Sequence, residues 1–178
     1  VEGLRDGIAN TPEKQAKYIQ TIANKVNDMD KLIDELTIYS RLDANRVLYT
    51  FVKFDVSEYF DDCCDEIGTE LDAAGIELNY RNHIKEPVII AADPEQLKRV
   101  INNIISNSVK YMAEGRKGKI DIDLYDESDY VHIIIADNGK GIAGKDVSHI
   151  FERFYRTDES RNSKQGGSGI GLAIVKKI

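Results

Sequence analysis

The chain has 178 residues, enough for one ordinary domain or for a small domain with an accessory helical element. Its composition, 42% hydrophobic and 31% charged, is typical of a folded protein and excludes a wholly disordered one. A net charge of −7 argues against a general nucleic-acid binder, which gains affinity by neutralising phosphates, but it is compatible with a local nucleotide pocket.

The apolar runs are far shorter than a membrane span and no signal peptide is visible, so we expect any membrane attachment to lie outside this chain. Cys63 and Cys64 are adjacent. They therefore point in different directions on a helix, which is not the spacing of a metal or redox site. We predict reduced thiols and a cytoplasmic location.

Residues 11–46 are predicted to form one long helix, which Thr11 caps and Pro12 suits in its first turn. Apolar residues then recur at alternating steps of three and four, namely Ile19, Ile22, Val26, Met29, Ile33 and Leu36. This heptad seam needs other helices to cover it. Because residues 1–10 resemble the tail of a preceding helix, we expect the later part of a helical hairpin that is completed in a dimeric four-helix bundle. The alternative is a helix packed on the rest of this chain.

After about Asn45 the hydrophobic period changes. Asp55 begins a capping box, and the helix after it places Phe60, Cys63, Ile67 and Leu71 on one face. The next elements are expected to be strands at 76–80 and 88–92, a helix after Asp93, and a hairpin of strands at 120–124 and 130–137. Helices segregated from hairpin-connected strands predict an α+β sandwich, a sheet with helices on one face.

The helix after Asp93 carries Asn103, Asn107 and Lys110 at steps of four and three, on one stripe. Such a stripe is either an exposed polar face or a source of carbonyl oxygens for a hard cation and an ammonium for phosphate. On this helix alone both interpretations stay open.

Residues 137–142, Asp-Asn-Gly-Lys-Gly-Ile, follow the last predicted strand. The sequence fits a common turn. It also fits a buried acceptor, Asp137, beside an open backbone that suits the exocyclic amine of adenine, with Ile142 packing near the ring.

Residues 150–167 are expected to be either a mobile lid anchored by Phe151 and Phe154 or an ordinary surface loop. The glycines of 166–172 then precede a predicted helix. They form either a flexible turn or a place where backbone amides approach a phosphate.

Taken together and in this order, the motifs Asn-x-x-x-Asn-x-x-Lys-Tyr, Asp-x-Gly-x-Gly-Ile, Phe-x-x-Phe-Tyr-Arg and Gly-x-Gly-Ile-Gly-Leu strongly resemble the nucleotide-binding boxes of sensor histidine kinases. The resemblance implies a two-layer, Bergerat-type ATP-binding sandwich with a mixed sheet and helices on one face, preceded by a long helix of a dimeric four-helix bundle. Residues 1–46 are then the C-terminal part of the dimerisation and phosphoacceptor hairpin. Residues 47–178 are the ATP-binding catalytic domain, which we expect to be truncated at its C-terminus.

The resemblance implies ATP and Mg²⁺ as ligands. It makes Asn107 the Mg²⁺ ligand with Asn103 as its neighbour one turn earlier, Lys110 the phosphate contact, Tyr111 a residue flanking the nucleotide, and Asp137 the adenine reader. The other implied nucleotide-binding residues are Gly139, Gly141, Ile142, Arg156, Gly167, Ser168, Gly169, Gly171 and Leu172. Ser108 stands where the family usually has alanine, a change that we expect to be tolerated.

Relatives that hydrolyse ATP carry a glutamate at the position that Asn103 matches, where it acts as a base for water. An amide is not a base at neutral pH, so the resemblance favours transfer of the phosphoryl group to a presented nucleophile. His83, His132 and His149 lack the family's acceptor pattern and are predicted to have structural or surface roles. We expect the acceptor upstream of Val1, so that this chain alone binds ATP without phosphorylating itself.

The predicted function is that of a protein histidine kinase, which transfers the γ-phosphoryl group of ATP to a histidine on the dimerisation helix and then to an aspartate of a response regulator receiver domain. The expected setting is a homodimer joined through the heptad helix, with no nucleic-acid partner, in the cytoplasmic part of a bacterial inner-membrane receptor. A hinge near 43–48 would let the ATP domain reach its acceptor. The alternatives are a nucleotide-binding dimerisation scaffold without turnover and an anti-sigma-type serine kinase, which would not need the helix at 11–46.

Overall fold

The computed structural model describes residues 10–44, 46–157 and 167–178. Most of the predicted helix tail at 1–10 and most of the predicted lid's polar stretch lie outside these residues. The chain divides into two compact units, residues 1–45 and 46–178.

The first unit contains the long helix α2, Pro12–Asp43, which confirms the predicted helix but ends three residues earlier. The Thr11 side chain caps it by accepting a hydrogen bond from the Lys14 N–H at 3.3 Å. Most of the predicted seam is open to solvent, because Ile19, Val26, Met29, Ile33 and Leu36 are 44–60% exposed. The helix thus presents an uncovered apolar stripe.

The second unit is built on a three-stranded sheet of β2 (Glu77–Asn82), β4 (Lys119–Glu127) and β5 (Tyr130–Asp137), in the order β2-β4-β5. β2 runs parallel to β4, whereas β4 and β5 form the predicted antiparallel hairpin. The sheet is therefore mixed, as expected.

A second, two-stranded antiparallel sheet pairs β1 (Val52–Asp55) with β3 (Ile89–Ala92). The sequence pattern did not predict β1. Four residues are too few to display a period of two, and only the pairing with β3 identifies the segment as a strand.

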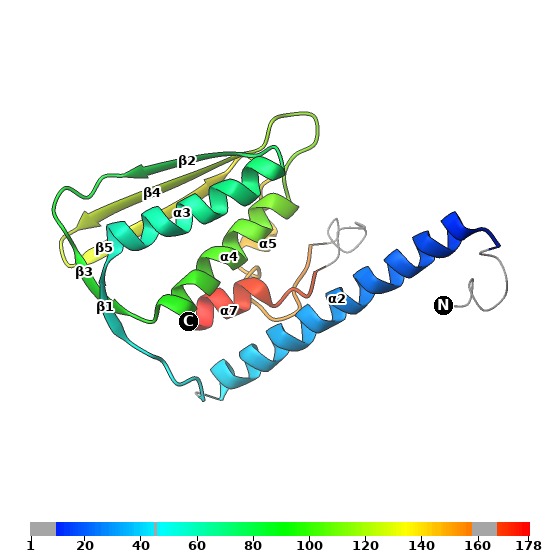
Figure 1. Cartoon of the computed structure of the whole chain (residues 1–178). Coiled ribbons are helices and arrows are strands. Elements are labelled where there is room, and N and C mark those ends of the chain that lie inside the picture. The colour runs from blue at the N-terminus through cyan, green and yellow to red at the C-terminus, as the bar shows by residue number, and fades with distance from the viewer. Residues whose placement is uncertain (1–9, 45, 158–166) are drawn as a thin grey trace. The chain divides into compact units, whose positions relative to one another are not determined.

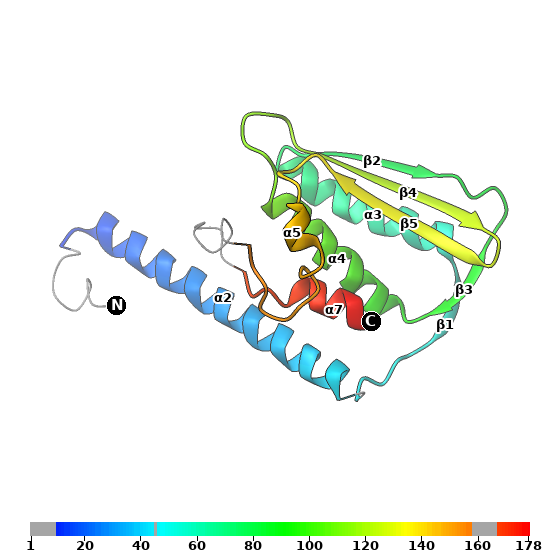
Figure 2. The same cartoon turned by 180° about the vertical axis from the view of Figure 1, so that it is seen from behind.

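The helices α3 (Val56–Ala73) and α4 (Pro94–Lys110) cover one face of the three-stranded sheet, as Figures 1 and 2 show from opposite sides. On β4, Ile120, Ile122 and Leu124 are fully buried against them. The same core includes Val56, Phe60, Cys63, Cys64, Ile67, Leu71, Ile76, Ile101 and Ile105. This arrangement confirms the predicted α+β sandwich.

Aspartates at both helix starts fix where α3 and α4 begin. Asp55 accepts hydrogen bonds from the Ser57 N–H at 2.8 Å and the Glu58 N–H at 3.2 Å. Asp93 caps α4 through the Gln96 N–H at 3.1 Å and also accepts the Thr50 N–H at 2.8 Å. That bond from Thr50 is the main reason why the pKa of Asp93 is lowered.

The described residues of the second unit also form two shorter helices, α5 (Gly144–Val147) and α7 (Gly171–Lys177). Figures 1 and 2 both place α7 beside α4, and Ile170, Ala173 and Ile174 are buried there. This confirms the helix predicted after the last glycines. Within residues 10–44, 46–157 and 167–178, no helix combines the length and the apolar character that crossing a membrane requires.

The adjacent thiols lie on α3, where Cys63 and Cys64 are buried and unpaired. Burial raises the pKa of both thiols, that of Cys64 to about 12. Both side chains therefore act as small apolar core residues.

Candidate functional site

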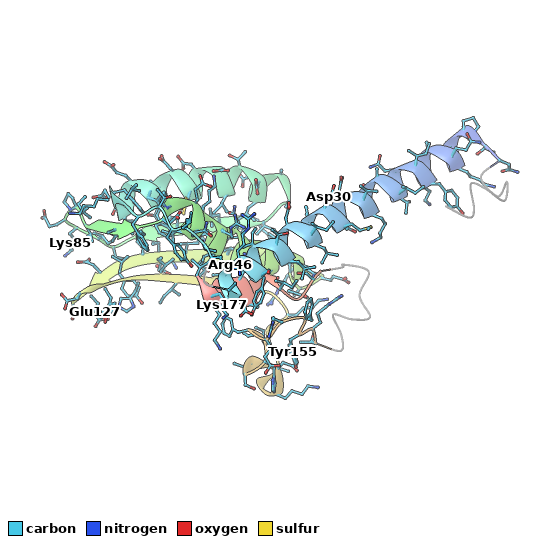
Figure 3. The ribbon with its side chains drawn as sticks, turned by 90° about the horizontal axis from the view of Figure 1, so that it is seen from below. Asp30, Arg46, Lys85, Glu127, Tyr155 and Lys177 are labelled. Atoms are coloured by element: carbon cyan, nitrogen blue, oxygen red, sulfur yellow. The ribbon has the colours of Figure 1, made fainter. Side chains whose placement is uncertain are left out.

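The predicted motifs gather around the C-terminal half of α4, at the end of the sheet where β4 begins and β5 ends. Figure 3 labels Lys85 and Glu127 at the opposite end of the sheet. On α4, Asn103, Asn107 and Lys110 are all half-buried. Asp93 caps the start of this helix. The steps of four and three between the three residues place them on the same side of it.

The amide and ammonium groups of α4 lie against the glycines of 167–171. A Cβ atom added to Gly171 would stand 3.1 Å from the Asn103 Oδ1 atom. At Gly167 it would overlap the Nζ atom of Lys110. The structure therefore brings together the asparagine motif and the glycine motif, which are about 60 residues apart in the sequence.

Asn107 lies between these two residues on α4. Among the described residues, its side-chain amide forms no hydrogen bond, while its backbone carbonyl accepts the Tyr111 N–H at 3.0 Å. The Lys110 ammonium sits 5.0 Å from the centroid of the Tyr111 ring, a cation–π contact. The side-chain oxygen of Asn107 thus has no hydrogen-bond partner among the described residues.

Asp137 is the last residue of β5, and two donors hold its carboxylate. The Ser108 hydroxyl donates to Oδ2 at 3.0 Å, and the Gly139 N–H donates to Oδ1 at 2.8 Å. The prediction that Asp137 is buried is wrong, because the residue is exposed. β5 is an edge strand among the described strands, so its last residue is covered on one side only.

The turn after Asp137 is fitted closely to the end of α4. A Cβ atom on Gly139 would lie 2.7 Å from both the Asp137 Oδ1 atom and the Tyr111 carbonyl oxygen. The Lys140 N–H donates to that same carbonyl at 3.0 Å. Gly141 has a φ of +74°, which favours glycine, with open space around it. Ile142, the expected packing partner of the ring, is 51% exposed.

Two further residues, Asn138 and Arg116, hold this turn, and neither was predicted to belong to the site. Asn138 accepts the Lys119 N–H at 2.9 Å and donates to the Lys117 carbonyl at 3.0 Å. The Arg116 guanidinium donates to the backbone carbonyls of Asn138 and Gly139. Asn138 stands inside a recognised motif, whereas Arg116 lies in a loop that carries no sequence signal.

The segments before and after the polar stretch of the predicted lid are joined by a hydrogen bond, which forms the base of that stretch. The Phe154 N–H donates to the Gly169 carbonyl at 2.9 Å, and both residues have positive φ, +60° and +72°. A Cβ atom on Gly169 would lie 2.8 Å from the Tyr155 carbonyl oxygen, so only glycine fits there without displacement. Ser168 accepts the Ile170 N–H at 3.0 Å, which completes this turn into α7.

The side chains that anchor this base are not the ones predicted. Phe151 and Phe154 are 40% and 59% exposed, so neither anchors the segment by burial. Instead the Tyr155 hydroxyl, on the segment labelled in Figure 3, donates to the buried Asp146 carboxylate at 2.6 Å. Arg156 follows and is half-buried. Of the other predicted residues, Leu172 is half-buried in the first turn of α7.

His83 and His132 lie on strands or next to one, away from these motifs, whereas the His149 ring stacks on Tyr155. The His83 Nε2 atom is 3.0 Å from the Asp123 carboxylate, and the His132 ring stacks on Tyr125. The His149 Nδ1 atom is 2.7 Å from the Glu152 carboxylate. Hydrogen bonds from Arg81, followed by that of His83, hold the pKa of Asp123 well below its usual range.

The groups at this site suit the binding of an anion together with a hard cation. An ammonium and backbone amides suit phosphate oxygens, and amide carbonyls are oxygen ligands of the kind that Mg²⁺ accepts. Among the described ranges there is no group of three or more His, Cys, Asp or Glu side chains that could hold a metal.

Comparison with known proteins identifies the second unit. Residues 92–178 match the family described as "Histidine kinase-, DNA gyrase B-, and HSP90-like ATPase". The sensor histidine kinase WalK of Bacillus subtilis is 29% identical over the whole chain, which covers 29% of WalK. The sensor protein VanS of Enterococcus faecium is 32% identical over 93% of this chain and 42% of its own length. The chain thus spans roughly a third of the length of its curated relatives.

Solved structures share the fold. Histidine kinase AdeS of Acinetobacter baumannii aligns over 99% of this chain and 77% of its own, with a TM-score of 0.72 and 22% identity. Full-length ShkA in complex with AMPPNP aligns over 94% of this chain and 34% of its own, with a TM-score of 0.76 and 24% identity. Histidine kinase ThkA in complex with the response regulator protein TrrA aligns over 83% of this chain and 42% of that one, with a TM-score of 0.67 and 26% identity. Residues 92–178 therefore match the model of the histidine kinase-, DNA gyrase B- and HSP90-like ATPase family, and the chain is homologous to sensor histidine kinases.

Proposed function

We propose that the chain is the ATP-binding catalytic region of a two-component sensor kinase, joined to part of its dimerisation hairpin. In the whole protein this region transfers the γ-phosphoryl group of ATP to a histidine on the dimerisation helix, and from there to an aspartate of a response regulator. One observation carries the proposal: Asp137, Asn107, Lys110 and the glycines of 167–171 meet around one half of α4.

The base end of the site is assigned to Asp137. Its carboxylate accepts the exocyclic amine of adenine, and the bonds from Ser108 and Gly139 already hold it in position. An acceptor that is oriented before the ligand arrives loses less freedom on binding, which raises affinity without any further contact.

The phosphate end is assigned to Lys110 and the backbone amides of 167–171. The Lys110 ammonium stands next to Gly167, where no side chain separates it from the backbone. A flexible ammonium and backbone amides together neutralise and orient phosphate oxygens. Gly169, with its φ of +72°, lets this backbone pass close to the Tyr155 carbonyl.

The residue proposed to hold Mg²⁺ is Asn107, through its open amide oxygen, with Asn103 one turn earlier. Mg²⁺ keeps several waters and takes its remaining ligands from one or two protein oxygens and the substrate phosphates, which this donor set matches. When bound, the ion neutralises charge on the phosphates. Asn103 supplies no base for water, so the site favours transfer to a presented nucleophile over hydrolysis.

The proposed partners follow from α2 and from the relatives. The exposed seam of α2 is proposed to pair with a second copy of the chain in a helical bundle. A receiver domain is proposed as the phosphoryl acceptor downstream, because ThkA was solved with a response regulator protein. The two buried thiols are consistent with the cytoplasmic location that we propose.

Calorimetric titration with ADP and ATP, with and without Mg²⁺, tests the proposal on the full chain. We expect the parent to bind both nucleotides. Asp137→Ala should weaken binding by up to about 100-fold, because the exocyclic amine of the base loses its carboxylate acceptor. Asn107→Ala should bind nucleotide but lose the gain that Mg²⁺ provides.

Circular dichroism of the same samples separates the possible failures. A well-folded parent that binds neither nucleotide would contradict the proposal and favour the dimerisation scaffold without turnover. If binding is confirmed, the whole kinase should be examined for acid-labile phosphohistidine. Acid-stable phosphoserine on a partner would instead support the anti-sigma-type serine kinase.

A further inference from the structure

The Ser108 hydroxyl is used differently from the helical hydroxyls of Thr21, Thr37 and Ser106. In a helix, serine and threonine usually donate to the backbone carbonyl one turn earlier. Thr21 and Thr37 do so at 2.8 Å, and Ser106, on the same helix as Ser108, donates to the Asn103 carbonyl at 3.2 Å. Ser108 is only 5% exposed, yet its proton goes across to β5, to the Asp137 carboxylate.

This bond completes the set of donors that hold Asp137 from inside the protein. The Gly139 N–H occupies Oδ1 and the Ser108 hydroxyl occupies Oδ2, so each carboxylate oxygen has one fixed donor. Two donors on different elements, α4 and the turn after β5, prevent rotation of the carboxylate. Either donor alone would leave it free to turn about the bond that carries it.

The same bond sets the polarity of the edge that a base would meet. Because Ser108 gives its only proton to Asp137, the hydroxyl and the carboxylate both present lone pairs. An exocyclic amine, as in adenine, supplies the donor that such an edge needs. A carbonyl at the same position of the ring, as in hypoxanthine, meets only acceptors and is rejected.

We propose that Ser108 is a positioning residue that fixes the Asp137 carboxylate and thereby sets the preference of this site for adenine over carbonyl-bearing purines. The inference rests on the proposed function, since it assumes that Asp137 reads the base. Ser108 stands where the sensor histidine kinases that the chain resembles usually have alanine, and the inference gives this serine a role. An alanine there leaves Asp137 with one donor, so this chain should have a better oriented carboxylate than a protein that carries alanine.

The test measures ADP and IDP in competition with a fluorescent ADP analogue on the full chain, so that weak IDP binding still gives a value. The variants are Ser108→Ala, the matched control Ser106→Ala on the same helix, and both changes in an Asp137→Ala background. Urea unfolding of each variant is measured in parallel.

Ser108→Ala is expected to weaken ADP by about tenfold, the effect of one hydrogen bond to an ionised group, and to leave IDP nearly unchanged. The ratio of the two affinities therefore falls by about the same factor. Ser106→Ala should leave the ratio unchanged. In the Asp137→Ala background, Ser108→Ala should have no further effect on either nucleotide, because the two residues act through each other.

Each other outcome overturns the inference in a recognisable way. Equal losses for ADP and IDP, with a matching loss of stability in urea, would show that Ser108 is structural only. An unchanged ratio in Ser108→Ala, or an undiminished effect of that change in the Asp137→Ala background, would exclude a role through the carboxylate. A folded parent that binds no ADP overturns the proposed function as well, whereas the other outcomes leave it standing.

Discussion

The two glycine-bearing segments that flank α4 are built in opposite ways. In residues 137–141, side chains and backbone of the same unit bind the polar groups, with Ser108, Lys119, Arg116 and the Tyr111 carbonyl as partners. In residues 167–171, the side chains of Lys110 and Asn103 border Gly167 and Gly171, whereas the backbone of Phe154 and Tyr155 borders Gly169. One segment is a turn held by fixed bonds, and the other is bordered at both its ends by side chains that can move.

This difference suits a ligand with two unlike ends. A base is flat and must be recognised by a carboxylate in one orientation, which requires a preformed edge. A phosphate chain is charged and changes during transfer, so an ammonium on a four-carbon stem can follow it at little cost. The contrast predicts that a steric clash introduced in residues 137–141 cannot be relieved by movement of the neighbouring atoms. A clash introduced in residues 167–171 can be relieved more easily.

The largest effect is expected for Gly139→Ala. Its Cβ atom would lie 2.7 Å from two oxygens, those of Asp137 and Tyr111, in a turn that is held on all sides. The free energy of unfolding should fall by about 3 kcal/mol, which urea denaturation measures. Gly144→Ala is the control, because a Cβ there meets nothing within 4 Å, and it should change stability by less than about 0.5 kcal/mol.

Gly169→Ala sharpens the comparison because it combines two costs. Its φ is +72° and its Cβ would lie 2.8 Å from the Tyr155 carbonyl oxygen. We expect a loss of about 2 kcal/mol, because the Phe154 and Tyr155 backbone that this Cβ meets lies outside the helices and strands. Gly75→Ala has a similar φ of +70° with open space and should cost about 1 kcal/mol. If Gly169→Ala costs more than Gly139→Ala in urea, the contrast between the segments is wrong.

Asn138→Ala examines how the first segment is held. The variant loses an acceptor for the Lys119 N–H and a donor to the Lys117 carbonyl. Stability should fall by about 1.5 kcal/mol, the value of two such bonds, one of them partly buried. Thermal unfolding followed by circular dichroism measures this loss. Asn82→Ala, which removes one bond to the Ile84 N–H at an exposed site, should cost less than half as much.

The smallest effect is expected for Tyr155→Phe, at the base of the second segment. Removing the hydroxyl leaves the buried Asp146 carboxylate without this donor and should cost about 1 kcal/mol. Hydrogen exchange should also speed up at the Phe154 amide, which donates to Gly169. Tyr130→Phe is the matched control, because that side chain is 72% exposed. Unchanged exchange at Phe154 would mean that Asp146 does not hold this segment.

Helices were predicted well because their signals are local. The aspartate caps at Asp55 and Asp93 appear where the sequence places them, and the spacing of Asn103, Asn107 and Lys110 brings these residues to one side of α4. Each of these inferences uses residues within two turns of one another, a range at which helical geometry is nearly constant.

What the sequence could not predict depends on distant pairings. β1 exists through its contact with β3, and nothing in either segment indicates that β2 and β4 run parallel. The partner of the Ser108 hydroxyl is known only once the end of β5 is placed beside α4. The exposure of Asp137 and of the two phenylalanines also depends on what covers them, which no local period encodes.

The reaction rate of the adjacent thiols on α3 can report how often the core of this unit opens. Because Cys63 and Cys64 are buried and the pKa of each is raised, a thiol reagent at neutral pH should react with them only when the α3 face leaves the core. The labelling rate then reports how often that core opens, without any substitution in the chain. A nucleotide that binds the folded unit must slow this rate by mass action, so two unreactive cysteines would register a ligand bound at the far side of α4.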